Sequence, residues 1–420
     1  MSILDSKYKT VRSVTGSLVR NLSSEDQMVQ TCPEACTAKW RQAYTTWFFE
    51  TFVLRPFLAD YKPFCEGFNR LFNSDYILRG EEIADKRVRV CFSRPSLEQV
   101  LAFRTHVDHE MERLLTRSLD AETTRRIMLG LNYEQQHQEL ILTDIKHAFF
   151  SNPLCPSYEE ASLAVESGHP IPKLRWHSVQ GGLIEIGYPV NAKDPLDLCF
   201  ENETPRHRIF LEPFRVANRK VTCREYLEFV SDDAYMRPEL WRSDGWETVK
   251  QGVWEAPLYW ERDSDDATGW RVFTLRGWYG LSLLLDTPVC HISFFEADAF
   301  ARWRGCRLPT EAEWELVASQ QSCTGNLLDA KRLHPAVAIG EDIDQFFGDC
   351  WEWTASPYTF YPGYKPLPGA LSECNGKFMC GQMVLRGGSC VTPADHMRVT
   401  YRNFFLPATR WQFTGMRLAA

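Results

Sequence analysis

The chain has 420 residues, which is too long for one ordinary hydrophobic core, so we expect two or three domains. Its composition, 44% apolar and 24% charged, is typical of a soluble globular protein. The net charge of -8, with 47 basic against 55 acidic residues, leaves no positive excess for nucleic acid, and no apolar run approaches the length of a membrane span.

The N-terminal third of the chain has apolar residues at helical spacing. Its first residues, 1–14, lack the apolar stretch of a signal peptide, which predicts a cytoplasmic protein. The spacing predicts helices at 7–21, 39–54, 68–76 and 130–150, and another that begins after the N-cap Ser96. Long helices with one apolar stripe each predict an up-and-down four-helix bundle over residues 1–152, whose centre could hold a site between facing helices.

The stretch 130–150 carries the most distinctive polar residues of this bundle. Tyr133 and His137 are one helical turn apart, and Gln136 precedes the histidine. Tyr133, His137, Leu140 and Asp144 form a stripe on the helix that is separate from the apolar one. A histidine in such a helix indicates a metal site when a second ligand lies one turn away or on a facing helix. Here the residue one turn from His137 is Tyr133.

Residues 153–175 contain four prolines and lose all periodicity, which predicts a linker between domains. In residues 176–420, short alternating runs predict strands at 182–187 and 206–211, and other patterns predict short helices at 222–230 and 294–304. Thr310 and Glu313 form a capping box, which predicts a helix at 311–318. We expect an α+β domain with extensive irregular structure. Trp351 and Trp353 should belong to its buried aromatic core, and Gly387 and Gly388 should form a tight backbone turn.

The 14 cysteines are scattered and include no CxxC pair, so we expect free thiols in a reducing compartment. Cys32 and Cys36 are the closest couple. They could contribute to a structural zinc site only with two further ligands, because such a site takes four.

Several strings occur in an order typical of one family: TTWFFETFVL, EQQHQELILTDIKHAF, RLPTEAEWE, GDCWEWTASPY, NGKFMCGQMVLRGGSC and TYRNFFLPATRWQFTGMRLA. Over nearly its whole length the chain resembles the iron-dependent sulfoxide synthases of ergothioneine biosynthesis (EgtB type). The resemblance implies a multidomain α and α+β protein, with a DinB-like four-helix bundle before a formylglycine-generating-enzyme-like domain of C-type-lectin-like fold. It also implies a non-haem iron at which O2 joins the sulfur of cysteine, or of a cysteine peptide, to the imidazole of hercynine, a trimethylated histidine, as a sulfoxide.

The resemblance implies three imidazole ligands for the iron, and this sequence keeps only His137. Tyr44 and Tyr133 stand where the family motif has histidine, and Arg41 stands at a position that is often histidine in relatives. Tyr44, Tyr133 and His137 could therefore hold a harder ion such as Fe(III) through phenolate oxygens. Alternatively, the two phenols could fill the cavity of a protein that has lost iron.

A third alternative takes ligands from elsewhere, for which the candidates are His106 and His109 on the preceding helix. Their pattern also fits one solvated and one packed histidine. A formylglycine-generating activity is disfavoured, because it would need a pair of thiols in the final segment and Cys390 is the last cysteine.

The resemblance further implies a substrate site. It places Gln136, Asn403 and Phe404 around the betaine end of hercynine, where amide oxygens and an aromatic face suit a quaternary ammonium without an N–H donor. Arg410 is the candidate partner of a substrate carboxylate, and Tyr76 is the candidate catalytic residue near the oxidising centre. An active enzyme would form a carbon–sulfur bond with a thiol, or a carbon–selenium bond with a selenol. An inactive homologue would be a hercynine-binding or betaine-binding protein.

Overall fold

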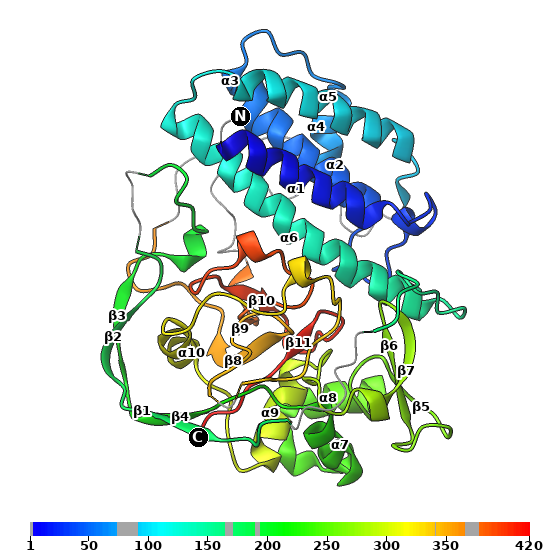
Figure 1. Cartoon of the computed structure of the whole chain (residues 1–420), viewed down its shortest axis with the longest axis vertical. Helices are drawn as coiled ribbons and strands as arrows, with labels where there is room; N and C mark the ends of the chain where they lie inside the picture. Colours follow the sequence, from blue (N-terminus) through cyan, green and yellow to red (C-terminus); the bar gives the residue numbers. More distant parts are fainter. Residues whose placement is uncertain (1–2, 74–90, 164–170, 190–193, 341, 366–377) are drawn as a thin grey trace. The chain divides into compact units, whose positions relative to one another are not determined.

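The computed structural model describes residues 3–73, 91–163, 171–189, 194–340, 342–365 and 378–420 (Figure 1). The chain divides into two compact units. The first, which we call the helical unit, comprises Met1–Leu154, Val190–Glu201 and Lys365–Cys374. The second, the mixed unit, comprises Cys155–Pro189, Asn202–Tyr364 and Asn375–Ala420.

The helical unit contains four long helices that pack side by side, as the apolar periodicity predicts (Figure 1). Helices α1 and α2 both contact α5 and α6, which gives the unit its bundle form. Its elements are α1 (Ile3–Val19), α2 (Ala38–Phe49) with a π-helical continuation (Glu50–Leu54), α3 (Arg55–Phe57), α4 (Gly67–Phe72), α5 (Leu97–Leu115) and α6 (Ala121–Ser151). The first helix begins four residues earlier than expected, and α6 begins nine residues earlier than the stretch at 130–150.

Local capping explains where three of these helices begin. The hydroxyl of Thr37 accepts a hydrogen bond from the backbone N–H of Trp40 at the start of α2. The predicted N-cap at Ser96 is confirmed, because Ser96 forms a full capping box with Gln99 at the start of α5. Asp120 accepts from the N–H of Thr123, which starts α6 well before Gly130.

A buried charge network joins α6 to α1 and α5. The carboxylate of Glu134 accepts hydrogen bonds from Arg12 Nη1 at 2.9 Å, from Arg104 Nη2 at 2.5 Å and from the hydroxyl of Thr15 at 2.6 Å. Burial raises the pKa of Glu134, but Arg104 and Arg12 lower it by more, to about 2. Glu134 is therefore ionised at neutral pH and holds three helices at fixed positions around it.

The mixed unit contains short strands, short helices and long connections, as expected from its sequence (Figure 1). Its helices are α7 (Cys223–Ser231), α8 (Ser243–Gly252), α9 (Phe294–Trp303) and α10 (Glu311–Ala318). Its strands are β1 (Trp176–Val179), β2 (Gly182–Ile186), β3 (His207–Leu211), β4 (Phe214–Ala217), β5 (Trp260–Arg262), β6 (Trp270–Thr274), β7 (Gly277–Gly280), β8 (Trp351–Pro357), β9 (Met383–Arg386), β10 (Asn403–Phe405) and β11 (Thr414–Gly415). The capping box of Thr310 and Glu313 is present at the start of α10, which confirms that helix.

The strands pair in four small sheets. The central sheet has the order β10-β9-β8-β11, with β9 antiparallel to both β8 and β10, and β11 parallel to β8. Antiparallel pairs β1–β4 and β2–β3 and the ribbon β5-β6-β7 make up the rest. Because β10 pairs with β9, Asn403 lies opposite Leu385 and Phe404 opposite Val384.

The scaffold residues of the central sheet are placed as the sequence predicts. Trp351 and Trp353 on β8 are both fully buried. Gly387 and Gly388 follow β9 with φ angles of 97° and 78°, a conformation that favours glycine. A Cβ atom at Gly387 would also lie 2.4 Å from a backbone carbonyl oxygen, so this turn leaves no space for a side chain.

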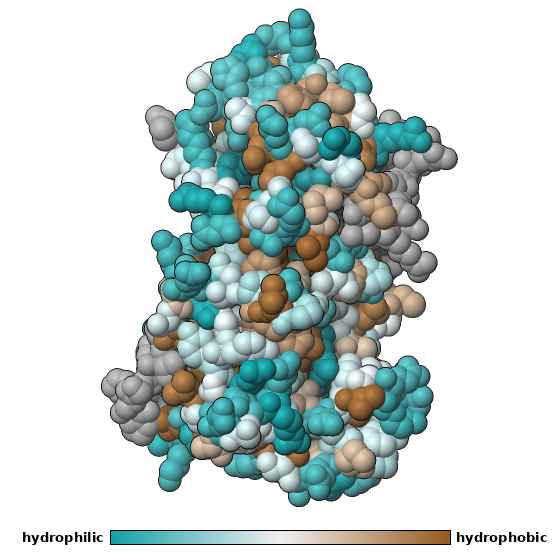
Figure 2. All heavy atoms as spheres, turned by 90° about the vertical axis from the view of Figure 1, so that its right-hand side faces the viewer, coloured by the Kyte–Doolittle hydropathy of each residue, from teal (hydrophilic) through white to brown (hydrophobic). Residues whose placement is uncertain are grey.

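Hydrophobic side chains on one face of the molecule occur singly or in small groups among hydrophilic ones (Figure 2). Leu183 and Phe210, partners across β2 and β3, are among the exposed apolar residues. In the described parts of the chain, no helix combines the length and the apolar character needed to cross a membrane.

Candidate functional site

The residues in the expected iron position lie where α2 faces α6. We call them the α2–α6 cluster, which consists of Trp40, Arg41, Tyr44, Tyr133, His137 and Asp144. Arg41 and Tyr44 share a face of α2 because they are three residues apart, and α6 presents its members at intervals of four and seven. The helical periodicity of two segments about 100 residues apart thus assembles the cluster.

Two aromatic contacts hold Tyr44 in the cluster. Its ring stacks on Trp40, with centroids 4.8 Å apart and planes at 14°, and lies 4.9 Å from the ring of His137. Tyr133 packs differently, because its ring lies 5.3 Å from Phe48 and 5.7 Å from Phe200. The structure therefore brings Tyr44 to His137 and surrounds both phenols with aromatic side chains.

Arg41 is the central charged residue of the cluster. Its Nε donates to Asp144 Oδ2 at 2.9 Å, its Nη2 donates to the same oxygen, and its Nη1 lies 3.0 Å from Nδ1 of His137. Asp144 Oδ2 also accepts from the backbone N–H of Cys36 at 3.2 Å. Burial lowers the pKa of Arg41, but Asp144 and the nearby thiols of Cys36 and Cys32 together raise it above its ordinary value, so the guanidinium remains charged at any physiological pH.

The cluster does not fit the three-imidazole Fe(II) site that the family resemblance implies. It contains one imidazole, and Nδ1 of that imidazole lies 3.0 Å from the guanidinium cation of Arg41. In the part of the chain that the structure describes, no three His, Cys, Asp or Glu side chains are grouped so that they could hold a metal ion. We therefore derive no reaction step through iron bound to this cluster.

The other candidate ligands are engaged elsewhere or exposed. His106 lies with Nε2 3.1 Å from the backbone oxygen of Lys62 and packs against Tyr61 and Phe64, while His109 is exposed. This matches the expectation of one packed and one solvated histidine. Cys36 is buried and Cys32 half-buried, and burial raises the pKa of the Cys32 thiol to about 11. A protonated Cys32 is a poor metal ligand at neutral pH.

The residues expected at the betaine end of the substrate lie in both units. Gln136 is half-buried on α6 of the helical unit, directly before His137. Asn403 and Phe404 form the start of β10 in the mixed unit, where Asn403 Oδ1 accepts from the N–H of Phe404 at 2.9 Å. The ring of Phe404 stacks on Tyr358 with centroids 4.0 Å apart, so each ring covers one face of the other, and the Arg402 guanidinium lies 5.1 Å from the centroid of the Tyr358 ring.

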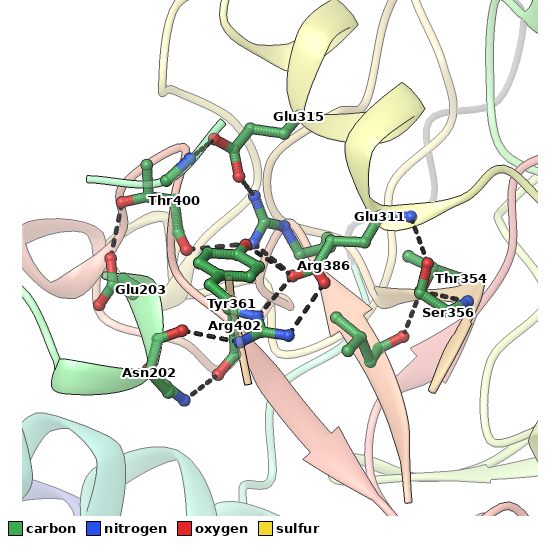
Figure 3. A network of polar contacts seen from close by, with 12 residues as sticks. Asn202, Glu203, Glu311, Glu315, Thr354, Ser356, Tyr361, Arg386, Thr400 and Arg402 are labelled. Atoms are coloured by element: carbon green, nitrogen blue, oxygen red, sulfur yellow. Dashed lines mark hydrogen bonds and ion pairs between the residues drawn. The ribbon is translucent and has the colours of Figure 1, made fainter. Parts of the chain in front are cut away.

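A buried ion network holds the residue that precedes Asn403 (Figure 3). Arg402 donates from Nε to Glu311 Oε1 at 2.6 Å and from Nη2 to Glu311 Oε2 at 3.0 Å, and Glu311 also pairs with Arg386 on β9. Burial raises the pKa of Glu311, but Arg402 and Arg386 lower it by more. Because Glu311 of α10 pairs with Arg386 of β9 and with Arg402, the network anchors the residue from which β10 begins.

Arg410 has a protein partner in the structure. Its Nη1 donates to Glu296 Oε1 at 3.1 Å and to the backbone oxygen of Ala256 at 2.9 Å, and its guanidinium lies 3.8 Å from the ring centroid of Trp254. Glu296 also accepts from the hydroxyl of Tyr235 at 2.6 Å. Binding a substrate carboxylate at Arg410 would therefore have to compete with a buried carboxylate of α9 or share the guanidinium with it.

Sequence reasoning missed two features of the site. Arg41 is recognisable in the sequence as a departure from histidine, but its contacts with His137 and Asp144 are visible only once α2 faces α6. Glu134 lies between Tyr133 and His137 in the sequence. The sequence signal for it is an acidic residue among site positions, together with Arg12 and Arg104 on the apolar faces of two other helices. The candidate catalytic residue Tyr76 lies outside the described residues.

Comparison with known proteins gives three related observations. Residues 175–341 and 338–420 match the family model of the sulfatase-modifying factor enzyme 1-like domain. A hercynine oxygenase of Mycolicibacterium smegmatis is 30% identical over 327 residues, which are 70% of this chain and 71% of that protein. A hercynine oxygenase of Mycobacterium tuberculosis is 32% identical over 252 residues, covering 54% of this chain and 57% of the relative.

A more distant relative is ergothioneine biosynthesis protein 1 of Schizosaccharomyces pombe. It is 24% identical over 278 residues, which are 63% of this chain and 33% of the fungal protein. The chain thus spans a third to about seven tenths of the lengths of these relatives.

Proposed function

Because the chain belongs to the hercynine oxygenase family of ergothioneine biosynthesis, with a sulfatase-modifying factor enzyme 1-like domain, we propose that it is a sulfoxide synthase homologue that acts on hercynine. The observation that carries the proposal is the 30% identity to a hercynine oxygenase over 70% of the chain. That length exceeds either structural unit, so the similarity includes more than a widespread domain. A cytoplasmic location stays a prediction from the N-terminal sequence.

The proposed reaction joins the imidazole carbon of hercynine to the sulfur of a thiol. One imidazole C–H bond and one S–H bond break, a C–S bond forms, and the sulfur takes one oxygen atom. The oxidant is O2, which takes four electrons in total. Its second oxygen atom leaves as water with the two hydrogens from the broken C–H and S–H bonds. The donor is cysteine or a cysteine peptide, and a selenol would give the corresponding carbon–selenium product.

The betaine end of hercynine would be recognised without hydrogen bonds to its nitrogen. A quaternary ammonium has no N–H, so it binds to aromatic faces and to oxygen atoms that carry partial negative charge. In the mixed unit, the ring of Phe404 is the proposed face and the amide of Asn403 the proposed oxygen, and the family resemblance assigns the same role to the amide of Gln136 in the helical unit. We assign these roles, with Arg410 for the substrate carboxylate and Tyr76 near the reacting atoms, as part of the proposal.

A second candidate function is binding of hercynine, or a similar betaine, without oxidation. The observation that favours it is the Arg41–His137 contact, which places a guanidinium where a divalent cation is expected. The same betaine recognition serves both functions, so substrate binding alone does not separate them.

Two measurements test the proposal. Calorimetric titration with hercynine and with histidine, which lacks the three methyl groups, should show a clear preference for hercynine. Incubation with hercynine, cysteine, Fe(II) and 18O2 should then yield a sulfoxide that carries one 18O atom by mass spectrometry. Binding without product supports the second candidate, and no preference for hercynine over histidine refutes both.

A further inference from the structure

The geometry of Arg41 limits the chemistry of His137. A guanidinium is a hydrogen-bond donor at every nitrogen and has no acceptor atom. In the structure, Asp144 accepts from Nε and Nη2 of Arg41, which turns Nη1 toward Nδ1 of His137 at 3.0 Å. The guanidinium is therefore held from one side by a carboxylate, with its remaining edge directed at the imidazole.

The donor character of Arg41 sets the tautomer of His137. A neutral imidazole has one protonated and one unprotonated nitrogen. Because Nη1 of Arg41 can only donate, Nδ1 must accept, and the ring proton must be on Nε2. Metal-bound histidines have the opposite arrangement, in which the nitrogen away from the metal donates its proton to a carboxylate, a carbonyl oxygen or water. In this tautomer, neither nitrogen of His137 has a lone pair available to a metal ion.

Charge and packing in the cluster act in the same direction. Arg41 and Asp144 are both buried and form an ion pair, so the cluster already contains a compensated positive charge. A divalent ion at His137 would have to enter beside the Arg41 guanidinium. Tyr44 stands where the family motif has histidine. Its ring lies beside His137 and stacks on Trp40, so this position offers no second imidazole.

We infer that the α2–α6 cluster is a metal-free hydrogen-bonded centre, in which Arg41, positioned by Asp144, holds His137 with its proton on Nε2. His137 then serves as a hydrogen-bond donor, and the atom that faces its Nε2 must be an acceptor of the protein or of a substrate. The inference rests on the proposed function only for the expectation that iron would bind here. Iron that supports turnover would have to be held by other residues.

Nuclear magnetic resonance on histidine-labelled protein tests the tautomer directly. Two-bond couplings between ring protons and the 15N nuclei distinguish a protonated Nε2 from a protonated Nδ1, and His137→Gln identifies the signal by its loss. We expect the Nε2–H pattern for His137 in the wild-type chain. Arg41→Met should allow an Nδ1–H population to appear beside the Nε2–H form, because Nδ1 no longer has to accept a hydrogen bond, while Arg125→Met, which changes an exposed arginine of α6, should leave the His137 signal unchanged. A wild-type Nδ1–H pattern overturns the inference.

Iron retention provides an independent measurement. Wild type and His137→Gln are loaded anaerobically with Fe(II), desalted and analysed for iron per chain. We expect equal retention in the two proteins, each compared at the same folded fraction by circular dichroism. Stoichiometric iron that is lost in His137→Gln refutes the inference. A hercynine titration of the same samples keeps the outcomes separate, because failure to bind hercynine refutes the proposed function and leaves the tautomer result intact.

Discussion

Replacing Glu134 by glutamine is expected to destabilise the helical unit by about 3 kcal/mol, because the substitution leaves two buried arginines without their carboxylate. In the folded chain, Arg12 and Arg104 contact different oxygens of Glu134, at 2.9 and 2.5 Å. The Glu134 side chain has no exposed surface, so solvent does not screen these interactions. A glutamine amide has one oxygen for two guanidinium groups, and its NH2 group faces a donor.

The pKa of Glu134 leads to the same magnitude. It falls from the ordinary 4.5 to about 2 in the folded chain, and at 1.36 kcal/mol per pKa unit this corresponds to about 3 kcal/mol. Because the folded pKa lies below the unfolded one, this stabilisation is fully present above about pH 5 and is lost as the pH falls toward 2. The difference between wild type and Glu134→Gln should therefore be constant near neutral pH and shrink in acid.

Urea unfolding followed by circular dichroism at several pH values measures both quantities. The matched control is Glu122→Gln, the same substitution on the same helix, where an exposed carboxylate pairs with Arg126 at 2.8 Å. That control should cost less than about 0.5 kcal/mol. The reasoning is refuted if the two variants lose similar stability, or if the cost of Glu134→Gln is the same at pH 3 as at pH 7.

Three further predictions concern Gly130, Thr310 and Arg410. Gly130→Ala should lower the Tm, at a cost of about 1–3 kcal/mol, because its Cβ would lie 2.7–2.8 Å from phenylalanine side chains, whereas Gly16→Ala on α1, with nothing within 4 Å, should raise it. Equal effects would contradict the packing argument. Thr310→Ala should cost about 1 kcal/mol through loss of the capping box, and Thr310→Ser should restore most of it. Arg410→Gln should lower the Tm by leaving buried Glu296 without its cation, whereas weaker hercynine binding at an unchanged Tm would place the role of Arg410 at the substrate.

Much of the fold was predictable because its determinants are local. Ser96 and Thr310 begin their helices through contacts with residues three positions away, so a short stretch of sequence contains all the information. The helix around His137 was also predictable, but its start at Ala121 was not, because the cap at Asp120 lies outside the periodic stretch. Alternation of apolar residues located β2 and β3, but it did not show that these two strands pair with each other.

The candidate site was predictable as a set of positions but not as a set of contacts. The ordered family strings pointed to Tyr44, Tyr133 and His137, and the change of Arg41 from histidine was visible without any structure. Only the folded chain shows that Arg410 already pairs with Glu296 and that Phe404 stacks on Tyr358. These partners come from distant segments, so their identity depends on the packing of whole elements.

The sequence by itself determined the helical and mixed halves of this protein and its family, since periodicity, capping and ordered motifs are read along the chain. The tertiary structure alone decided the chemical state of His137. That state depends on which atom lies next to Nδ1, and the atom belongs to Arg41, 96 positions away in the sequence and fixed in turn by Asp144. A hydrogen bond acts over about 3 Å, so only the packing of α2 against α6 could reveal whether His137 faces a metal ion or a guanidinium.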